Sequence, residues 1–319
     1  MDARSDRGRP RQRASGGRIL ALALLCAVLA GCGGTQAIDP LEAAVEPGFV
    51  KSLNPQRIIS FGPNLTEAIF ALGQGHRVVA VTSFCDYPPE IEGLHRIGGP
   101  MDPDKEKITM LEPDLIVLQG QIKEVSDLAQ ANATPLLIVD MDSLATIDKG
   151  IAALGVALDC TGEADALRAR IRAGLEAVRN AVNGRPRPKV FISTGRMSHD
   201  LNSLYTVGGP SFLSELVSVA GGDNIYADAG IAYLEASKET VVMRAPGVVV
   251  EFHAGAKLTP EEQAAFTADW HGLPSLPAVR GGRVHLITES YTMRPGPRVT
   301  LIARQLASLL HPEATVPAP

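Results

Sequence analysis

Hydrophobic and polar positions alternate along the chain in a repeating strand-and-helix pattern. Short apolar runs rich in Val, Ile and Leu are separated by segments whose apolar residues recur at helical spacing. In the first half, strands are predicted at residues 57–62, 77–84, 114–118 and 135–140, with helices between them. The run at 114–118 is apolar throughout, which is typical of a parallel sheet covered on both faces. The alternation predicts a parallel, doubly wound α/β lobe.

The same pattern restarts in the second half, where strands are predicted at 189–194, 247–252 and 283–288. Between the halves, apolar or Ala residues at spacings of three and four predict one amphipathic helix, with such residues at 164, 167, 171, 175, 178 and 182. We therefore predict two lobes, residues 56–160 and 185–312, joined by a helix over 161–184. A single helical connection resists hinge bending, so we expect only a small closure of the lobes.

Two helix starts in the first lobe carry capping signals. Asn64 is expected to cap the helix that follows the first strand, with Glu67 three residues on and Gly73 at the helix end. Asp104 is expected to cap a short helix that Pro113 ends.

The N-terminus reads as an export signal. A basic segment precedes an apolar run of about 13 residues, which is too short to span a bilayer stably. The run ends in a sequence that resembles a lipobox, namely Leu29, Ala30, Gly31 and Cys32. We expect a lipoprotein signal peptide over 1–31, lipidation of Cys32 and a tether over 32–55, which would leave an exported protein held to a membrane by lipid only. An ordinary membrane anchor and a secretory cleavage site are the alternatives.

Composition narrows the function classes. The formal net charge of −5 gives no reason to expect nucleic acid as a partner. Aromatic residues make up only 4% of the chain, and its single Trp270 falls in a predicted helix away from the strand ends. After export and lipidation, Cys85 and Cys160 remain, and the sequence leaves open whether they form a disulfide.

One sequence motif occurs twice. EKITMLEPDLIVL begins at Glu106 and ETVVMRAPGVVVE begins at Glu239; in each, a Glu opens a short helix and a Pro and a strand follow at the same offset. One exposed carboxylate in each lobe suggests a partner with two-fold symmetry that could bind them through Arg side chains. The alternatives are a favourable position in the helix dipole and the duplication of an ancestral lobe without function.

Candidate ligand-binding residues follow from the topology, because ligands gather at the carboxyl ends of parallel strands. The residues selected in this way are Asn64, Phe84, Asp86, Tyr87, Gln119, Arg196, Phe252, His253, Tyr291 and Arg294. The chain contains no HExxH, GxSxG, P-loop or CxxC motif, and no nucleophile–base set emerges, so an enzyme and a metal site are not expected. A lipoprotein enzyme that uses Asp86 or His253 stays as the alternative of another class, and a signalling or scaffold lipoprotein is a third.

The ordered motifs RIISFGPNLTEAIFALG, VVAVTSFCDYPPE, IGGPMDPDKEKITMLEPDLIVL, TVGGPSFLSELVSVAGGDNIY and YTMRPGPR resemble the periplasmic substrate-binding proteins for cobalamin, ferric siderophores and haem, over residues 56–310. The resemblance implies two Rossmann-like lobes joined by one long helix, a ligand cleft between them, and delivery to an ABC permease dimer with ATPase subunits. It also implies that Glu106 and Glu239 dock into Arg pockets of the two permease subunits. The protein is expected to be a monomer without a cofactor.

The resemblance leaves the ligand open. FCDYPPE with GGPMDP looks most like the cobalamin-type branch, so a corrinoid is our first expectation. Arg196 and Arg294 would suit an anionic ferric siderophore or the propionates of haem, and His199, His253 or Tyr291 could ligate haem iron.

Overall fold

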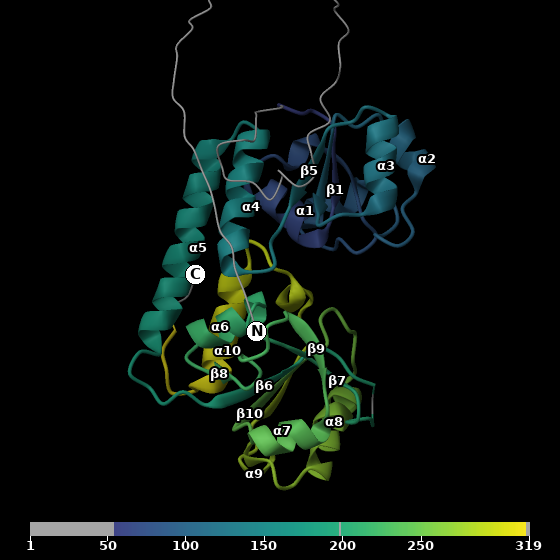
Figure 1. The fold of residues 1–319 in the computed structure, drawn as a ribbon. Helices are drawn as coiled ribbons and strands as arrows, with labels where there is room; N and C mark the ends of the chain where they lie inside the picture. Colours follow the sequence, from purple (N-terminus) through teal and green to yellow (C-terminus); the bar gives the residue numbers. More distant parts are fainter. Residues whose placement is uncertain (1–53, 198, 317–319) are drawn as a thin grey trace, which may run out of the picture. The chain divides into compact units, whose positions relative to one another are not determined.

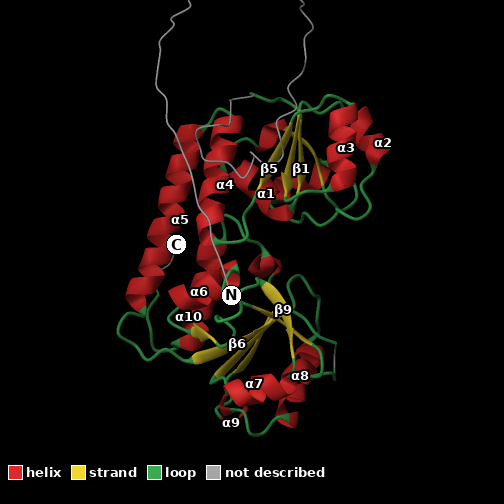
Figure 2. Cartoon of the chain, viewed as in Figure 1, coloured by secondary structure: helices red, strands yellow, loops and turns green. Residues whose placement is uncertain are grey.

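The structure is a computed structural model that describes residues 54–197 and 199–316. The predicted signal peptide, Cys32 and all but the last two residues of the predicted tether lie outside this part of the chain. Two α/β lobes with mainly parallel sheets make up the described residues, as the strand-and-helix pattern predicts (Figures 1 and 2).

The first lobe is built on a parallel five-stranded sheet in the order β3-β2-β1-β4-β5. Its strands are β1 Ile58–Phe61, β2 Val78–Val81, β3 His95–Arg96, β4 Leu115–Gln119 and β5 Leu136–Val139. The α-helices between and after them are α1 Pro63–Ala71, α2 Lys105–Met110, α3 Lys123–Ala131 and α4 Leu144–Ala157, and two 3-10 turns are η1 Gly75–Arg77 and η2 Pro89–Gly93.

The second lobe contains a parallel sheet in the order β11-β10-β6-β8 and a separate antiparallel ribbon of β7 and β9. The strands are β6 Lys189–Ser193, β7 Leu204–Val207, β8 Asp223–Asn224, β9 Tyr233–Ala236, β10 Val248–Phe252 and β11 Val284–Ile287. The helices are α6 Phe212–Val219, α7 Lys238–Arg244, α8 Pro260–Asp269, η3 Trp270–Gly272, α9 Pro277–Arg280, η4 Ser290–Met293 and α10 Val299–Leu310. The ribbon was not predicted.

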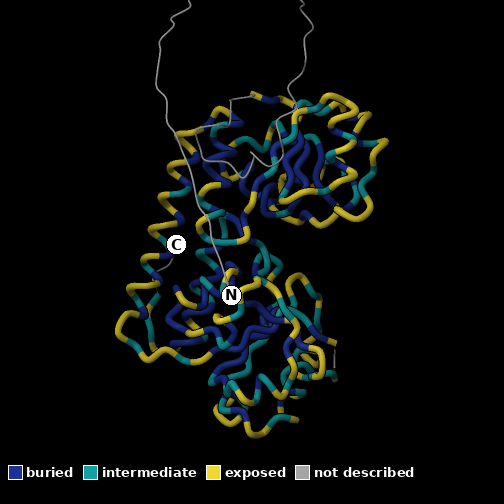
Figure 3. Tube along the Cα trace, viewed as in Figure 1, coloured by how far each residue is buried: buried dark blue, intermediate teal, exposed yellow. Residues whose placement is uncertain are grey.

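Both sheets are covered on both faces, which explains their apolar strands (Figure 3). One continuous apolar core contains residues of α1 and α4 of the first lobe, of the connecting helix α5 (Thr161–Ala181), and of α6 and α10 of the second lobe. Helices α2 and α3 cover the opposite face of the first sheet, whereas α7 and η3 cover that of the second. No helix among the described residues is long and apolar enough to cross a bilayer.

The predicted amphipathic helix is α5, Thr161–Ala181. It buries Leu167, Ile171 and Leu175 on one face, and helix α4 packs alongside it (Figure 1). A Cβ atom added at Gly155 of α4 would lie 2.4 Å from the Ala164 Cβ atom, so glycine is what permits this close approach.

Helix α4 also contacts the second lobe. Glu215 of α6 accepts a 2.6 Å hydrogen bond from the Leu144 N–H, and the Phe212 N–H donates to the Asp142 carbonyl at 2.9 Å. A carboxylate at the first turn of a helix is favoured by the helix dipole. The connection between the lobes is therefore reinforced by α4 beside α5.

The two capping predictions have opposite outcomes. Asp104 caps α2 as predicted, because its carboxylate accepts from the Lys107 N–H at 2.9 Å. The prediction for Asn64 is wrong: Gly62 is the N-cap residue of α1, and Asn64 lies inside the helix with its amide turned to other elements. Pro63 at the first helical position starts α1 without a side-chain cap.

Candidate functional site

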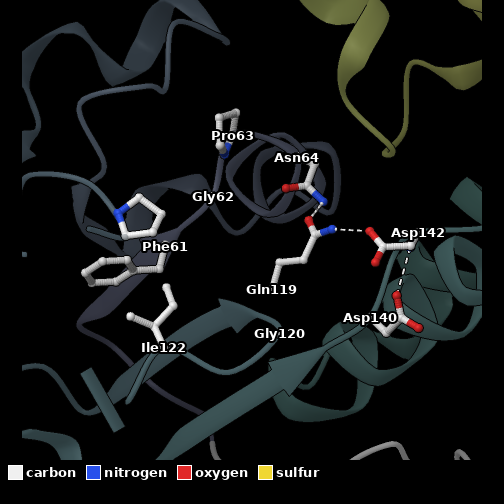
Figure 4. A pocket seen from close by; sticks show the side chains of 10 residues that line it. Phe61, Gly62, Pro63, Asn64, Gln119, Gly120, Ile122, Asp140 and Asp142 are labelled. Carbon is white, nitrogen blue, oxygen red and sulfur yellow. Dashed lines mark hydrogen bonds between the residues drawn. The ribbon is translucent and has the colours of Figure 1, made fainter. Parts of the chain in front are cut away.

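A hollow of about 440 Å³ lies at the carboxyl ends of β1, β4 and β5 (Figure 4). This is the edge where a parallel α/β sheet receives ligands. Apolar groups form one side of the hollow and polar groups the other; the lining residues are Phe61, Gly62, Pro63, Asn64, Pro100, Gln119, Gly120, Ile122, Asp140 and Asp142.

The polar side of the hollow is a hydrogen-bonded chain. The Asn64 amide donates to Gln119 Oε1, and the Gln119 amide donates to Asp142 Oδ1 at 2.8 Å (Figure 4). The Asp142 N–H in turn donates to Asp140 Oδ1 at 2.8 Å. Burial and the nearby Asp140 charge raise the pKa of Asp142, and the Gln119 hydrogen bond only partly opposes them. This series of hydrogen bonds fixes the orientation of two amides and two carboxyl groups at the rim of the hollow.

A segment of the second lobe contacts the first lobe beside this hollow. The Asn64 amide also donates to the Pro295 carbonyl at 3.1 Å. Glu67 on α1 has a side chain only 2% exposed, and it accepts from Arg298 Nε at 2.8 Å and Arg298 Nη2 at 2.5 Å. Arg294 Nη1 lies 3.5 Å from the same carboxylate. The negative charge that α1 buries is thus neutralised by the other lobe.

Arg294 and Arg298 also contact the turn after β2. Arg294 forms a two-pronged ion pair with Asp86, with 2.9 Å between Nη2 and Oδ2. Burial alone would raise the pKa of Asp86, but the hydrogen bond and charge of Arg294, helped by Ser290 and Arg298, hold it below its ordinary value. The Arg298 guanidinium lies 4.1 Å from the Tyr87 ring centroid and 5.1 Å from that of Tyr291.

Seven of the ten predicted ligand-binding residues therefore fall in two groups. Asn64 and Gln119 line the hollow, whereas the Arg294–Arg298 segment gathers Asp86, Tyr87 and Tyr291, and the Phe84 carbonyl accepts from Arg294 at 3.4 Å. The Phe84 ring is 62% exposed, which leaves a flat apolar surface open to solvent.

Three of the predicted ligand-binding residues, all in the second lobe, do not line the hollow. The Arg196 side chain is fully buried between Glu251 and Asp269, at 2.9 and 2.8 Å, and Phe252 is an interior residue. His253 Nε2 lies 2.6 Å from Glu251 Oε1, and its ring contacts Phe266. The rule that ligands gather at the carboxyl ends of strands (the strand-end rule) locates the backbone of these residues but not the direction of their side chains. Two of these side chains, Arg196 and His253, contact the buried Glu251.

Other residues at the site were missed by the sequence reasoning. Asp140 directly follows β5 and Asp142 lies two residues further on, so the strand-end rule could have found them had it been applied to that strand. Glu67 was interpreted as part of a helix start, although a carboxylate amid the apolar residues of LTEAIFA signals a buried ion pair. Its partner Arg298 carries no signal in the sequence alone.

The tryptophan and two cysteines of the described residues are buried. Trp270 is fully buried in η3 and does not line the hollow, but its indole N–H donates to Glu251 near the end of β10 at 2.7 Å. Cys85 and Cys160 are separate buried thiols. Within residues 54–197 and 199–316, no group of three or more His, Cys, Asp and Glu residues could hold a metal ion.

Glu106 and Glu239 occupy matching places in the two lobes. Each lies in the first turn of a short helix, α2 or α7, whose N-cap side chain accepts from the third backbone N–H. Both glutamates are exposed to solvent. The strands that follow, β4 and β10, each pair with the first strand of their sheet.

Two α/β lobes, a helical connection and a ligand-type hollow at the strand ends define a two-lobed solute-binding protein. The chain belongs to the periplasmic binding protein family, whose model matches residues 58–291. Proteins of this family bind solutes and are not enzymes, so this chain is an exported binding protein and its Asp86 and His253 are not catalytic groups.

Individual relatives support the same conclusion. A vitamin B12-binding protein of Pectobacterium carotovorum is 27% identical over 260 residues, which cover 80% of this chain and 88% of the relative. The structure of the periplasmic vitamin B12 binding protein of Vibrio cholerae has a TM-score of 0.67 and 26% identity, covering 81% of this chain and 97% of that one. A periplasmic heme-binding protein from Roseiflexus sp. RS-1 has a TM-score of 0.67 and 25% identity, covering 82% and 99%.

Replacing Glu67 by Ala is expected to destabilise the protein by about 3 kcal/mol, because removing one member of a buried ion pair leaves the other without a partner. The loss should be measured as the free energy of unfolding in urea. Glu92→Ala, at an exposed position of η2, is the matched control and should change stability by less than about 0.5 kcal/mol. Equal stability of the two variants would contradict the role assigned to Glu67.

The Asp86–Arg294 pair should make stability depend on acid. The folded-state pKa of Asp86 is lowered, so its stabilisation is fully present above the unfolded-state pKa of about 3.9 and is lost as the pH falls through the folded-state value. Wild type should therefore exceed Asp86→Asn in unfolding free energy at pH 7, and the difference should shrink below pH 4 as measured by urea titrations. A difference that grows in acid would have the wrong sign for this pair.

Proposed function

We propose that this chain is a lipid-anchored substrate-binding protein that captures a corrinoid of the cobalamin type and delivers it to an ABC permease. The proposal places the ligand at the hollow of the first lobe, in a cleft that the Arg294–Arg298 segment of the second lobe borders. Cys32 is the proposed lipidation site, residues 1–31 the proposed signal peptide, and residues 161–184 the proposed link between the lobes.

The lining of the hollow carries the choice of ligand. Its polar groups are amides and carboxyl groups, and no Arg, Lys, His, Tyr or Cys of the described residues lines it. A corrinoid bears amide side chains and holds its own metal, so it needs hydrogen-bonding groups rather than a metal ligand from the protein. The exposed Phe84 and Tyr87 rings offer flat apolar surfaces nearby for a planar macrocycle.

The same lining is less suited to the alternative ligands. An anionic ferric siderophore, or the propionates of haem, would meet the Asp140 and Asp142 carboxyl groups. Arg294, which could attract such anions, is already paired with Asp86. His253 is bonded to Glu251, and His199 Nδ1 lies 2.9 Å from Asp269. The vitamin B12-binding relatives support the corrinoid, whereas the heme-binding structure keeps haem as the second candidate.

Absorption spectra test the ligand directly. The purified protein is incubated in separate samples with cobalamin, haem and a ferric siderophore, and each sample is then desalted. Only the cobalamin sample should retain the absorption bands of its ligand, which are the corrin bands. Retention of a Soret band or of the siderophore charge-transfer band in place of the corrin bands would contradict the proposal. Gln119→Ala should weaken corrinoid binding about fivefold through the loss of one hydrogen bond, whereas Gln130→Ala on the exposed face of α3 should not.

Exchanging both Glu106 and Glu239 for Ala should leave ligand affinity intact and abolish uptake, because these exposed carboxylates are proposed to bind the two permease subunits. Ligand titration and uptake of labelled cobalamin by whole cells measure the two effects. The matched control replaces Glu124 and Glu261, which are exposed first-turn glutamates of α3 and α8. Normal uptake by the Glu106/Glu239 variant would refute the docking assignment.

A further inference from the structure

Helices α2 and α7 are alike beyond their glutamates. Their sequences are KEKITM and KETVVMR, and their N-caps Asp104 and Ser237 make the same hydrogen bond. Each helix is followed by a residue other than Gly in the left-handed region, Glu112 at φ 44° and Ala245 at φ 49°, and then by proline. The two helices are thus equivalent in capping, exit and position relative to the central strands.

The equivalence includes an exposed methionine. Met110 and Met243 lie one turn after Glu106 and Glu239, and their exposed fractions are 72% and 76%. Residues four apart share one face of a helix, so each Glu and Met lie together on the solvent side. On the opposite face of each helix, Ile108 and Val241 are buried in the core of their lobe, with exposed fractions of 1% and 0%.

A single exposed apolar side chain needs no explanation, but a matched pair does. Methionine is usually buried, and packing of either lobe does not require it at this place. The unbranched, polarizable thioether adapts to irregular apolar pockets, which suits a protein-binding surface. Two neighbouring lysines bond to other groups, since Lys107 Nζ donates to the Arg96 carbonyl and Lys238 Nζ to Asn202.

We propose that Met110 and Met243 form the apolar half of two equivalent docking surfaces, Glu106–Met110 and Glu239–Met243. The occupant is the two-subunit permease, with a cationic side chain beside an apolar pocket at each of its two sites. The inference rests on the proposed function. Both glutamates are exposed and, among the described residues, neither forms an ion pair, so each carboxylate is available to a cationic side chain of the partner. Such a surface combines a charged contact that gives register with a desolvated apolar contact that gives affinity.

The test measures the affinity of the ligand-loaded protein for the permease–ATPase complex, purified from the same organism's membranes and held in lipid nanodiscs. Met110→Ser with Met243→Ser should weaken binding at least tenfold, or about 1.4 kcal/mol, while corrinoid affinity stays unchanged. Each single variant should show part of that loss. Met110→Leu with Met243→Leu keeps the apolar volume and should stay within about twofold of wild type.

Met197→Ser is the matched control, because Met197 is also 76% exposed but does not lie on α2 or α7. Wild-type affinity of the Met110/Met243 serine variant would overturn the inference. If that variant binds normally while the Glu106/Glu239 variant does not, only the apolar half is refuted. If neither weakens binding, the docking assignment in the proposed function fails as well. A loss in only one single serine variant would overturn the two-fold arrangement.

Discussion

The buried carboxylate of Glu67 is the constraint on which the relation between the two lobes depends. Removing a carboxylate from water costs several kcal/mol, and that cost is offset only when charge and hydrogen bonds are supplied at close range. Here the first lobe buries the carboxylate within α1, while the second lobe supplies both guanidinium groups that bind it. At this point the first lobe alone would hold a buried carboxylate without a counter-ion. The pairing fixes the segment before α10 against the start of α1, and the continuous apolar core along α5 holds the opposite side.

This arrangement assigns separate tasks to the charged groups around the hollow. Arg294 and Arg298 of the second lobe pair with Asp86 and Glu67, so the charge of these two arginines is balanced before any ligand arrives. The hollow itself retains hydrogen-bonding amides and carboxyl groups. A site of this kind selects by the placement of polar contacts rather than by net attraction, because an attractive charge acts on many ligands whereas a fixed set of donors and acceptors suits few. Under the proposed function, the pairing of Arg294 with Asp86 thus bears on which class of chelate the protein accepts.

Local sequence determines the elements well and the directions of side chains poorly. Period and capping predicted α2 with its Asp104 cap, the amphipathic α5 and the central strands. The strand-end rule brought Asn64 and Gln119 to one hollow. It did not bring Arg196 to this hollow, because the nearby interior holds a second buried carboxylate, Glu251, that takes Arg196 as its counter-ion. The β7–β9 ribbon was missed since its short runs mix exposed and buried residues, and pairing between distant segments leaves no local period.

Part of the repeated motif has a structural cause. A capped short helix, a left-handed residue and a proline form a compact way to enter a central strand, and this accounts for the shared cap, exit and buried residue. The outward face is under no such constraint, since its side chains contribute little to either core. Under the proposed function, agreement between the lobes at Glu106 and Glu239, and again at Met110 and Met243, reflects what the helices present to a partner. A partner with two-fold symmetry can bind two matching surfaces of one chain at the same time, which is why we propose the two-fold permease as the occupant.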